Sequence, residues 1–259
     1  LERKWIDSIV NWMESIVRNH RFSVYALTIV LIIASMIGVY MIKISGSLIE
    51  DMPKGKEFFK DIVFFEEEFG GIMPLEIVID TKKENGVMSL STLKRMEKLD
   101  ETIEEIPQLS KPISVLNIVK YSKQAFYNGL PEYYQLPSSQ EKNWILNYSK
   151  NSSTNTHLLD NFVDSTGRYA RITTFMKDIG TDKMTNIEER LQQKINKEFP
   201  KEKYDVSMTG GALVFLKGTN YLINNLVISL SLAILLIAIF MAFMFRSFRM
   251  ILISLIPNI

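Results

Sequence analysis

The sequence predicts an α-helical membrane protein that carries an exterior α+β domain of the split βαβ, ferredoxin-like type. Phe22–Ile42 and Leu222–Phe245 contain no Asp, Glu, Lys, Arg or His. Helices of these lengths, with a rise of 1.5 Å per residue, measure about 31 and 36 Å, which is enough to cross a hydrocarbon core of roughly 30 Å. The segment between them alternates the two-residue hydrophobic period of strands with the 3.6-residue period of helices, which indicates a folded domain.

The composition excludes several classes of protein. The chain has 259 residues, of which 47% are hydrophobic, so it is not disordered by composition. Its 30 Lys and Arg balance 29 Asp and Glu, which argues against a nucleic-acid partner. It contains no cysteine, and this excludes disulfides, thiolate zinc sites and cysteine nucleophiles.

Residues 1–21 precede the first predicted transmembrane helix, residues 22–43. Their apolar residues recur at helical spacing, with Trp5 and Trp12 one heptad apart. This predicts a cytoplasmic amphipathic helix that either lies in the membrane interface or packs on another part of the protein. A cleaved signal peptide is disfavoured, because the apolar run exceeds the roughly 7 to 15 residues of such a signal.

Basic residues at the membrane ends set the orientation, because positively charged short loops stay in the cytoplasm. They place residues 44–221 outside the membrane. They also make residues 246–249 a cytoplasmic turn after a second transmembrane helix, residues 222–245. The arginines that determine this topology are Arg18, Arg21, Arg246 and Arg249.

A third apolar stretch, residues 250–259, is interpreted as the start of another transmembrane helix. The sequence stops within this stretch, and it begins with Leu1 rather than Met. The chain is therefore expected to be a fragment of a longer multi-pass protein.

The exterior segment opens with a helix and a strand. Apolar residues at helical spacing over Phe58–Phe69 predict a helix that Gly70 and Gly71 terminate, and this phenylalanine stripe is typical of a core face. Alternating residues over Leu75–Asp80 predict a strand, which a turn at Asn85-Gly86 follows.

Two strand–helix–strand units, with both helices on one face of the sheet, make up the predicted split βαβ arrangement. The remaining expected elements are a helix from Ser89 or Ser91 to Pro107, a strand near Ile113–Leu116, a helical piece over Ile118–Phe126, a surface insertion at residues 128–157 with a helix over Gln140–Tyr148, a hairpin of Asn161–Asp164 and Tyr169–Met176 around a turn at Ser165–Gly167, a helix from Thr181 or Asp182 to Pro200, and a strand over Tyr204–Thr209.

Gly210 and Gly211 follow the last predicted strand and precede an amphipathic approach to the second transmembrane helix. Glycine permits a sharp turn at such a place. The pair is either a hinge that couples movement of the sheet to the helix, or a tight junction. Sequence position alone favours the tight junction, because it does not demonstrate motion.

No pattern typical of an enzyme occurs. The GxxxxGK[ST], HExxH and GxSxG motifs are absent from the sequence, and His157, close to Asp160 and Asp164, is typical of a surface residue. The run Glu66–Glu68 could hold a hard cation only with ligands from elsewhere and is typical of a solvated helix end. The sequence therefore predicts no catalytic residue, no metal site and no cofactor.

Three motifs of this chain, by their order and spacing, resemble those of one known family. Phe69-Gly70-Gly71 precede the first exterior strand, Thr209-Gly210-Gly211 end the last one, and the second membrane helix runs into FRSFRMILISLIPN at Phe245–Asn258. Over nearly its whole length the chain resembles the resistance-nodulation-division (RND) superfamily, specifically its MMPL-like exporters of hydrophobic molecules. The resemblance implies the opening of one six-helix half, and the preceding cytoplasmic helix suggests the second half.

The resemblance implies part of an exporter of lipids or other hydrophobic molecules that the proton-motive force drives. It implies a multi-pass protein of the bacterial inner membrane, with residues 44–221 as a periplasmic porter-like domain. The expected partners are the lipid bilayer, a hydrophobic small molecule or lipid as substrate, the remainder of the transporter, and a second copy or a periplasmic accessory protein. The family's proton-carrying acids belong to a later helix that this sequence does not reach.

Because the proton-carrying acids lie elsewhere, the resemblance implies conformational and steric roles for the residues of this chain. Gly210 and Gly211 are the candidates for a hinge or coupling element. The candidates for the substrate path lie at the outer end of the second membrane helix and are Phe215, Leu222 and Leu226.

A transmembrane sensor with an exterior ligand-binding domain is the alternative. Two membrane helices that bracket an exterior domain fit it equally well. The apolar stretch after residue 250 disfavours it, because a sensor is expected to continue from its second membrane helix into a soluble signalling helix.

Overall fold

A computed structural model divides the chain into two compact units, Leu1–Ser45 and Gly46–Ile259. It describes residues 12, 18, 21–41, 46–50, 52–145 and 159–245. Most of the predicted cytoplasmic helix at residues 1–21, the turn at residues 246–249 and the apolar stretch at residues 250–259 therefore lie outside the described residues.

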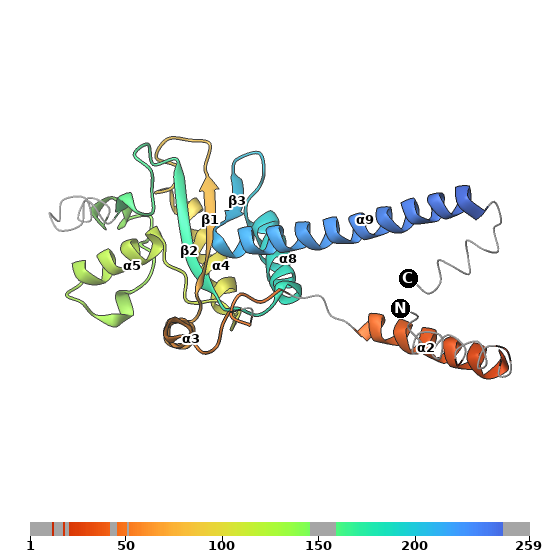
Figure 1. Ribbon diagram of the computed structural model, residues 1–259. Coiled ribbons are helices and arrows are strands. Elements are labelled where there is room, and N and C mark those ends of the chain that lie inside the picture. The colour runs from red at the N-terminus through yellow and green to blue at the C-terminus, as the bar shows by residue number, and fades with distance from the viewer. Residues whose placement is uncertain are drawn as a thin grey trace. The chain divides into compact units, whose positions relative to one another are not determined.

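The described elements are ten in number and appear in Figure 1. They are α2 (Arg21–Met41), α3 (Glu57–Phe69), β1 (Met73–Asp80), α4 (Leu90–Glu104), α5 (Val115–Phe126), the 3₁₀ helix η1 (Pro131–Tyr133), β2 (Tyr169–Met176), α8 (Thr181–Glu198), β3 (Asp205–Thr209) and α9 (Gly211–Phe245). The first unit contributes α2, whose apolar side chains are largely exposed. All the others belong to the second unit.

The second unit is built on a three-stranded sheet in the order β2-β1-β3, with β1 antiparallel to both neighbours. Ile77 lies opposite Ile172 on one side and Met208 on the other. Alternate residues of β1 are buried, which is the pattern of a sheet with one covered face.

That covered face packs against α4 and α8, which contact each other, and α4 is seen behind the strands in Figure 1. Leu93, Met96 and Leu99 of α4 belong to the same buried cluster as Leu191 and Ile195 of α8. Ser89 begins α4 by accepting the Thr92 N–H at 3.3 Å, as one of the two predicted caps. The sheet and these two helices form the core of residues 46–221, which we call the α+β domain.

The strand expected near Ile113–Leu116 is wrong. Ile113 forms a single bridge with Thr173, and the chain then turns into α5. Ser114 caps that helix, because its side chain accepts the Leu116 N–H at 3.2 Å while Asn117 accepts the Ser114 N–H at 2.8 Å. This local capping box outcompetes further pairing along β2.

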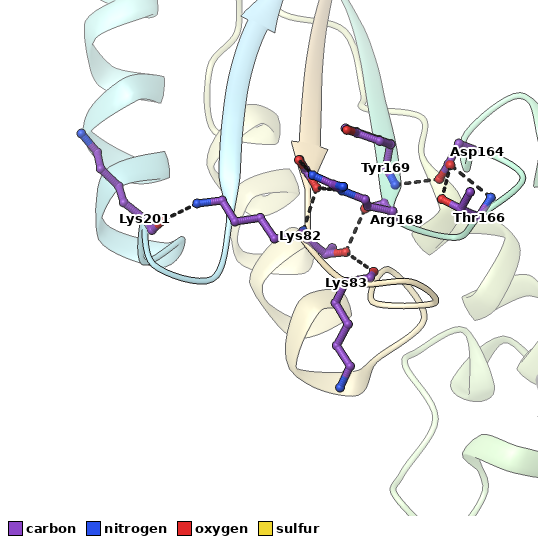
Figure 2. A network of polar contacts seen from close by, with 9 residues as sticks. Lys82, Lys83, Asp164, Thr166, Arg168, Tyr169 and Lys201 are labelled. Carbon is purple, nitrogen blue, oxygen red and sulfur yellow. Dashed lines mark hydrogen bonds and ion pairs between the residues drawn. The ribbon is translucent and has the colours of Figure 1, made fainter.

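The predicted hairpin before β2 is also shorter than expected, because its first arm pairs only through the bridge of Val163 with Ala170. Polar contacts close this end of the sheet, as Figure 2 shows. Arg168 donates twice to Asp80, with both distances 2.6 Å, and this pairing lowers the pKa of that carboxyl. Lys82 donates to the Lys201 carbonyl at 2.6 Å and so joins β1 to the turn before β3.

An ion pair and a hydrogen bond hold the described part of the predicted insertion, up to residue 145, against α5. Buried Lys123 lies 3.1 Å from Glu141, and Tyr127 donates to the same carboxylate at 2.7 Å. The Ser138 N–H and the Tyr127 hydroxyl lower the pKa of Glu141 to about 2. Residues 142–145 are helical, within the helix predicted over Gln140–Tyr148, and residues 146–148 lie outside the described residues.

The amphipathic approach and the second predicted transmembrane helix form one continuous helix, α9, of 35 residues. Its first turns are part of the core through Ala212, Leu213 and Leu216. Beyond Tyr221 its apolar side chains are mostly exposed. By length and composition, Gly211–Phe243 could cross a membrane, whereas Phe22–Gly38 of α2 is a shorter apolar helix.

Candidate functional site

An apolar groove lies along α3, and we call it the α3 groove. It has a volume of about 500 Å³. Residues from the helix, from the turn into β1 and from β2 line it. They are Phe58, Asp61, Ile62, Phe65, Phe69, Gly71, Ile72 and Phe175.

Four of the five phenylalanines of α3 are exposed and Phe59 is half-buried, although the sequence predicts this stripe to be core. All residues of α3 are described and none of them is buried. Phe58, Phe65 and Phe69 are 45%, 54% and 59% exposed. Exposed apolar side chains gathered on one helix face are typical of a surface that binds another apolar group.

Aromatic contacts order this face of the helix. Phe65 and Phe69, four residues apart, stack with ring centroids 5.0 Å apart, and Phe64 meets Phe65 edge to face at 6.1 Å. The stacked rings of Phe65 and Phe69 therefore form an apolar wall, and Phe64 packs on it from outside the groove.

The floor of the groove is set by a close approach of the chain to the end of β2. Gly71 has a φ of +149°, and a Cβ at this position would lie 2.6 Å from the carbonyl carbon of Met176. Ile72 donates its N–H to the Met176 carbonyl at 3.2 Å. Glycine at position 71 is thus required for the floor to form.

Two acidic residues, Glu66 and Asp178, join α3 to the turn between β2 and α8. Asp178, in the turn between β2 and α8, donates its N–H to Glu66 of α3 at 3.1 Å. Burial raises the pKa of Glu66; the hydrogen bond from the Asp178 N–H opposes this effect, and the negative charge of the Asp178 carboxyl adds to it. The sequence does not predict this pair, because the two residues are 112 positions apart.

Asp100, on α4, is a second carboxyl group in an apolar setting. The Ser114 hydroxyl donates to its Oδ2 at 3.4 Å, whereas its Oδ1 is buried and has no hydrogen-bond partner among the described residues. Burial raises its pKa to about 7, although the positive charge of Lys120 acts in the opposite direction. Asp100 therefore titrates in the neutral range.

The predicted substrate-path residues are not part of the α3 groove. Phe215 is half-buried in the first turns of α9, close to Gly46, whereas Leu222 and Leu226 are 69% and 68% exposed on the same helix. None of the three is among the described residues that line the groove. They remain candidates for contact with lipid or substrate along α9.

The two glycines at the junction have different environments. Gly210 has a φ of +102°, and a Cβ there would lie 2.5 Å from the Pro74 carbonyl oxygen. Gly211 is the first residue of α9 and meets only the side chain of Pro74 within 3.4 Å. This geometry supports a tight junction at Gly210, and a role as hinge stays a prediction.

The topology arginines fall mainly outside the described side chains. Arg18 is exposed in a helical position and Arg21 begins α2, whereas Arg246 and Arg249 lie outside the described residues, as does His157. Within the described residues, no group of three His, Cys, Asp or Glu is arranged to hold a metal ion.

No protein-family model matches the chain, and comparison with curated proteins finds no match.

Proposed function

We propose that this chain is part of an RND-type exporter, driven by the proton-motive force, that moves lipids or other hydrophobic molecules. In this proposal α2 and the apolar part of α9 cross the inner membrane of a bacterium, and the α+β domain is a periplasmic porter-like domain. The α3 groove is the place where the domain receives an apolar substrate.

The accessible α3 groove is the observation that carries this proposal. Its volume of about 500 Å³ falls within the range of roughly 300 to 1,000 Å³ that is usual for small-molecule sites. A ligand that covers exposed phenylalanine gains about 25 cal/mol for each Å² of apolar surface removed from water. An acyl chain suits this open apolar face better than a polar metabolite does.

Continuity between the α+β domain and a membrane-length helix supports the second part of the proposal. The first turns of α9 are packed in the domain core, and the same helix continues through 24 residues without a charged side chain, Leu222–Phe245. A helix that is fixed at one end in a core moves with that core. Rearrangement of the domain can therefore reach the membrane without a flexible linker.

Replacing Phe65 with serine is expected to weaken binding of a fluorescent long-chain acyl probe by about tenfold, which corresponds to roughly 1.4 kcal/mol of lost apolar contact. The measurement is a fluorescence titration of the full chain in lipid nanodiscs. Phe64→Ser is the matched control, because Phe64 is 57% exposed on the same helix and does not line the groove.

Equal loss of binding in both variants would show that the probe adsorbs to the whole helix rather than to the groove. Probe efflux from vesicles that contain the complete multi-pass protein then separates exporter from sensor. The exporter predicts efflux that stops when the proton gradient is dissipated. A sensor with the same groove binds the probe and shows no efflux.

A further inference from the structure

Glu66 and Asp178 join three segments that are distant in the sequence. Glu66 belongs to α3 and accepts the Asp178 N–H through Oε1. Asp178 Oδ2 accepts the Ser47 hydroxyl and the Ile49 N–H, each at 2.6 Å. The segment 46–50 is held a third time, because the Gly46 N–H donates to the Thr181 hydroxyl at 3.2 Å.

Two oxygen atoms of this pair are left without donors. Glu66 Oε2 and Asp178 Oδ1 are both buried, and neither has a hydrogen-bond partner among the described residues. An ionised carboxylate can only accept hydrogen bonds, so two ionised groups here repel each other and leave both atoms unsatisfied. One proton resolves both problems, because a protonated carboxyl becomes a donor.

The charged groups around the pair are mixed. Lys177 adjoins Asp178 in the turn and Glu67 adjoins Glu66 on α3, and these two exert opposite effects on the Glu66 carboxyl. Segment 46–50 offers neutral donors, and its charged residue, Glu50, is exposed. Asp182 lies in the first turn of α8. The raised pKa of Glu66 agrees with the geometry, since burial is its largest cause.

We propose that Glu66 and Asp178 form a proton-dependent clasp. In the closed clasp, protonated Glu66 donates from Oε2 to Asp178 Oδ1 and holds α3 and segment 46–50 on the turn between β2 and α8. When Glu66 loses its proton to water, the two carboxylates repel each other and α3 is released. The clasp does not depend on which molecule the α3 groove binds or on whether the protein is an exporter.

The clasp also affects the α3 groove, because α3 contains both Glu66 and one wall of the groove. Glu66 lies in the same helix as Phe58, Phe65 and Phe69, which form one wall of the groove. Release of the helix therefore moves that wall relative to Phe175 of β2. A local drop in pH closes the wall, and a rise opens it.

Distance measurements between spin labels test the clasp directly. The chain has no cysteine, so labels can be placed through Lys60→Cys on α3 and Lys183→Cys on α8, both at exposed positions. For the full chain in nanodiscs, we expect a narrow distance distribution at acidic pH and loss of that narrow distribution at alkaline pH. The pH at which it is lost reports the titration of Glu66.

Three variants make the test specific. Glu66→Gln keeps an acceptor and supplies a permanent donor, so its distribution is expected to stay narrow at both pH values. Asp178→Asn supplies a donor to ionised Glu66, so its distance distribution is also expected to stay narrow at both pH values. Glu67→Gln removes an equal charge from an exposed neighbour on α3 and is expected to behave as the unaltered chain does.

The proposal is overturned if the unaltered chain gives one distribution at both pH values, or if Glu66→Gln broadens at alkaline pH as the unaltered chain does. Narrowing at alkaline pH on addition of Ca²⁺ also overturns it, because the pair would then be a cation site rather than a proton site. The infrared carbonyl band of a protonated carboxyl, lost in Glu66→Gln, gives a second readout if the labelled variants fold poorly.

Discussion

Replacing Gly210 with alanine is expected to destabilise the α+β domain by about 3 kcal/mol or more. The residue has a φ of +102°, which side chains other than glycine rarely adopt. In addition, a Cβ would lie 2.5 Å from the Pro74 carbonyl oxygen, which is backbone and has no freedom to move aside. Thermal unfolding in detergent measures the effect.

Gly211→Ala is the matched control for this prediction. Its Cβ would meet the ring carbons of Pro74 at 3.3 Å, which is tight but lies against a side chain, and alanine favours the first turn of a helix. A cost below about 1 kcal/mol is expected. If alanine is tolerated equally at both positions, the junction rearranges freely, and Gly210 would act as a hinge rather than as a fixed turn.

Replacing Asp100 with asparagine is expected to stabilise the protein at alkaline pH and to leave it unchanged near pH 4. The folded protein raises the pKa of Asp100 from 3.8 to about 7, so folding is favoured while the group is protonated. The stability is present in full below about pH 4 and is lost as the pH rises through about 7. The loss amounts to at most roughly 4 kcal/mol, and asparagine removes it because it carries no charge.

The measurement is the pH dependence of the unfolding free energy between pH 4 and pH 8. Glu101→Gln is the control, since it removes the same charge from an exposed position of the same helix. A parallel decline of stability in Asp100→Asn and the unaltered chain would mean that another group is responsible. A marked loss of stability at pH 4 would show that the contact with Ser114 needs the carboxyl itself.

Elements with a clear local signal were predictable from the sequence. The alternation of Leu75–Asp80 gives β1, and the apolar spacing that ends at Pro107 gives α4, because period and capping depend on neighbouring residues. The strand expected near Ile113 failed because Ser114 and Asn117 form a cap there. The apolar residues that suggested a strand and the polar residues that form the cap are both local signals, and the cap determines the structure here.

The start of α9 was not predictable in the same way. Lys217 and Asn220 interrupt the apolar run, so the sequence suggests a separate approach before the membrane-length stretch. Helical hydrogen bonds do not depend on side-chain polarity, and the helix continues through these residues. Burial of Ala212 and Leu216 in the domain core fixes its first turns.

The candidate site depends on long-range contacts, and only part of it has a sequence signal. The solvated helix end expected at Glu66–Glu68 is wrong for Glu66, whose Oε2 is buried. Its position between Ile62 and Phe69 of the apolar stripe is the local signal for this burial, as the position four residues after Met96 is for Asp100. Their partners, Asp178 and Ser114, come from other elements. The phenylalanines are exposed because no described element covers that face of α3. The spacing of apolar residues in a sequence does not show whether another element packs on the face that they form.

The proposed function requires that α9 crosses the membrane and that the α+β domain lies outside it. Labelling of a single cysteine, Lys183→Cys at an exposed position of α8, with a membrane-impermeant maleimide in intact cells tests this most directly. The account predicts full labelling without permeabilisation and a chain that requires detergent for extraction. Labelling only after permeabilisation, or recovery of the chain in the soluble fraction, would contradict it.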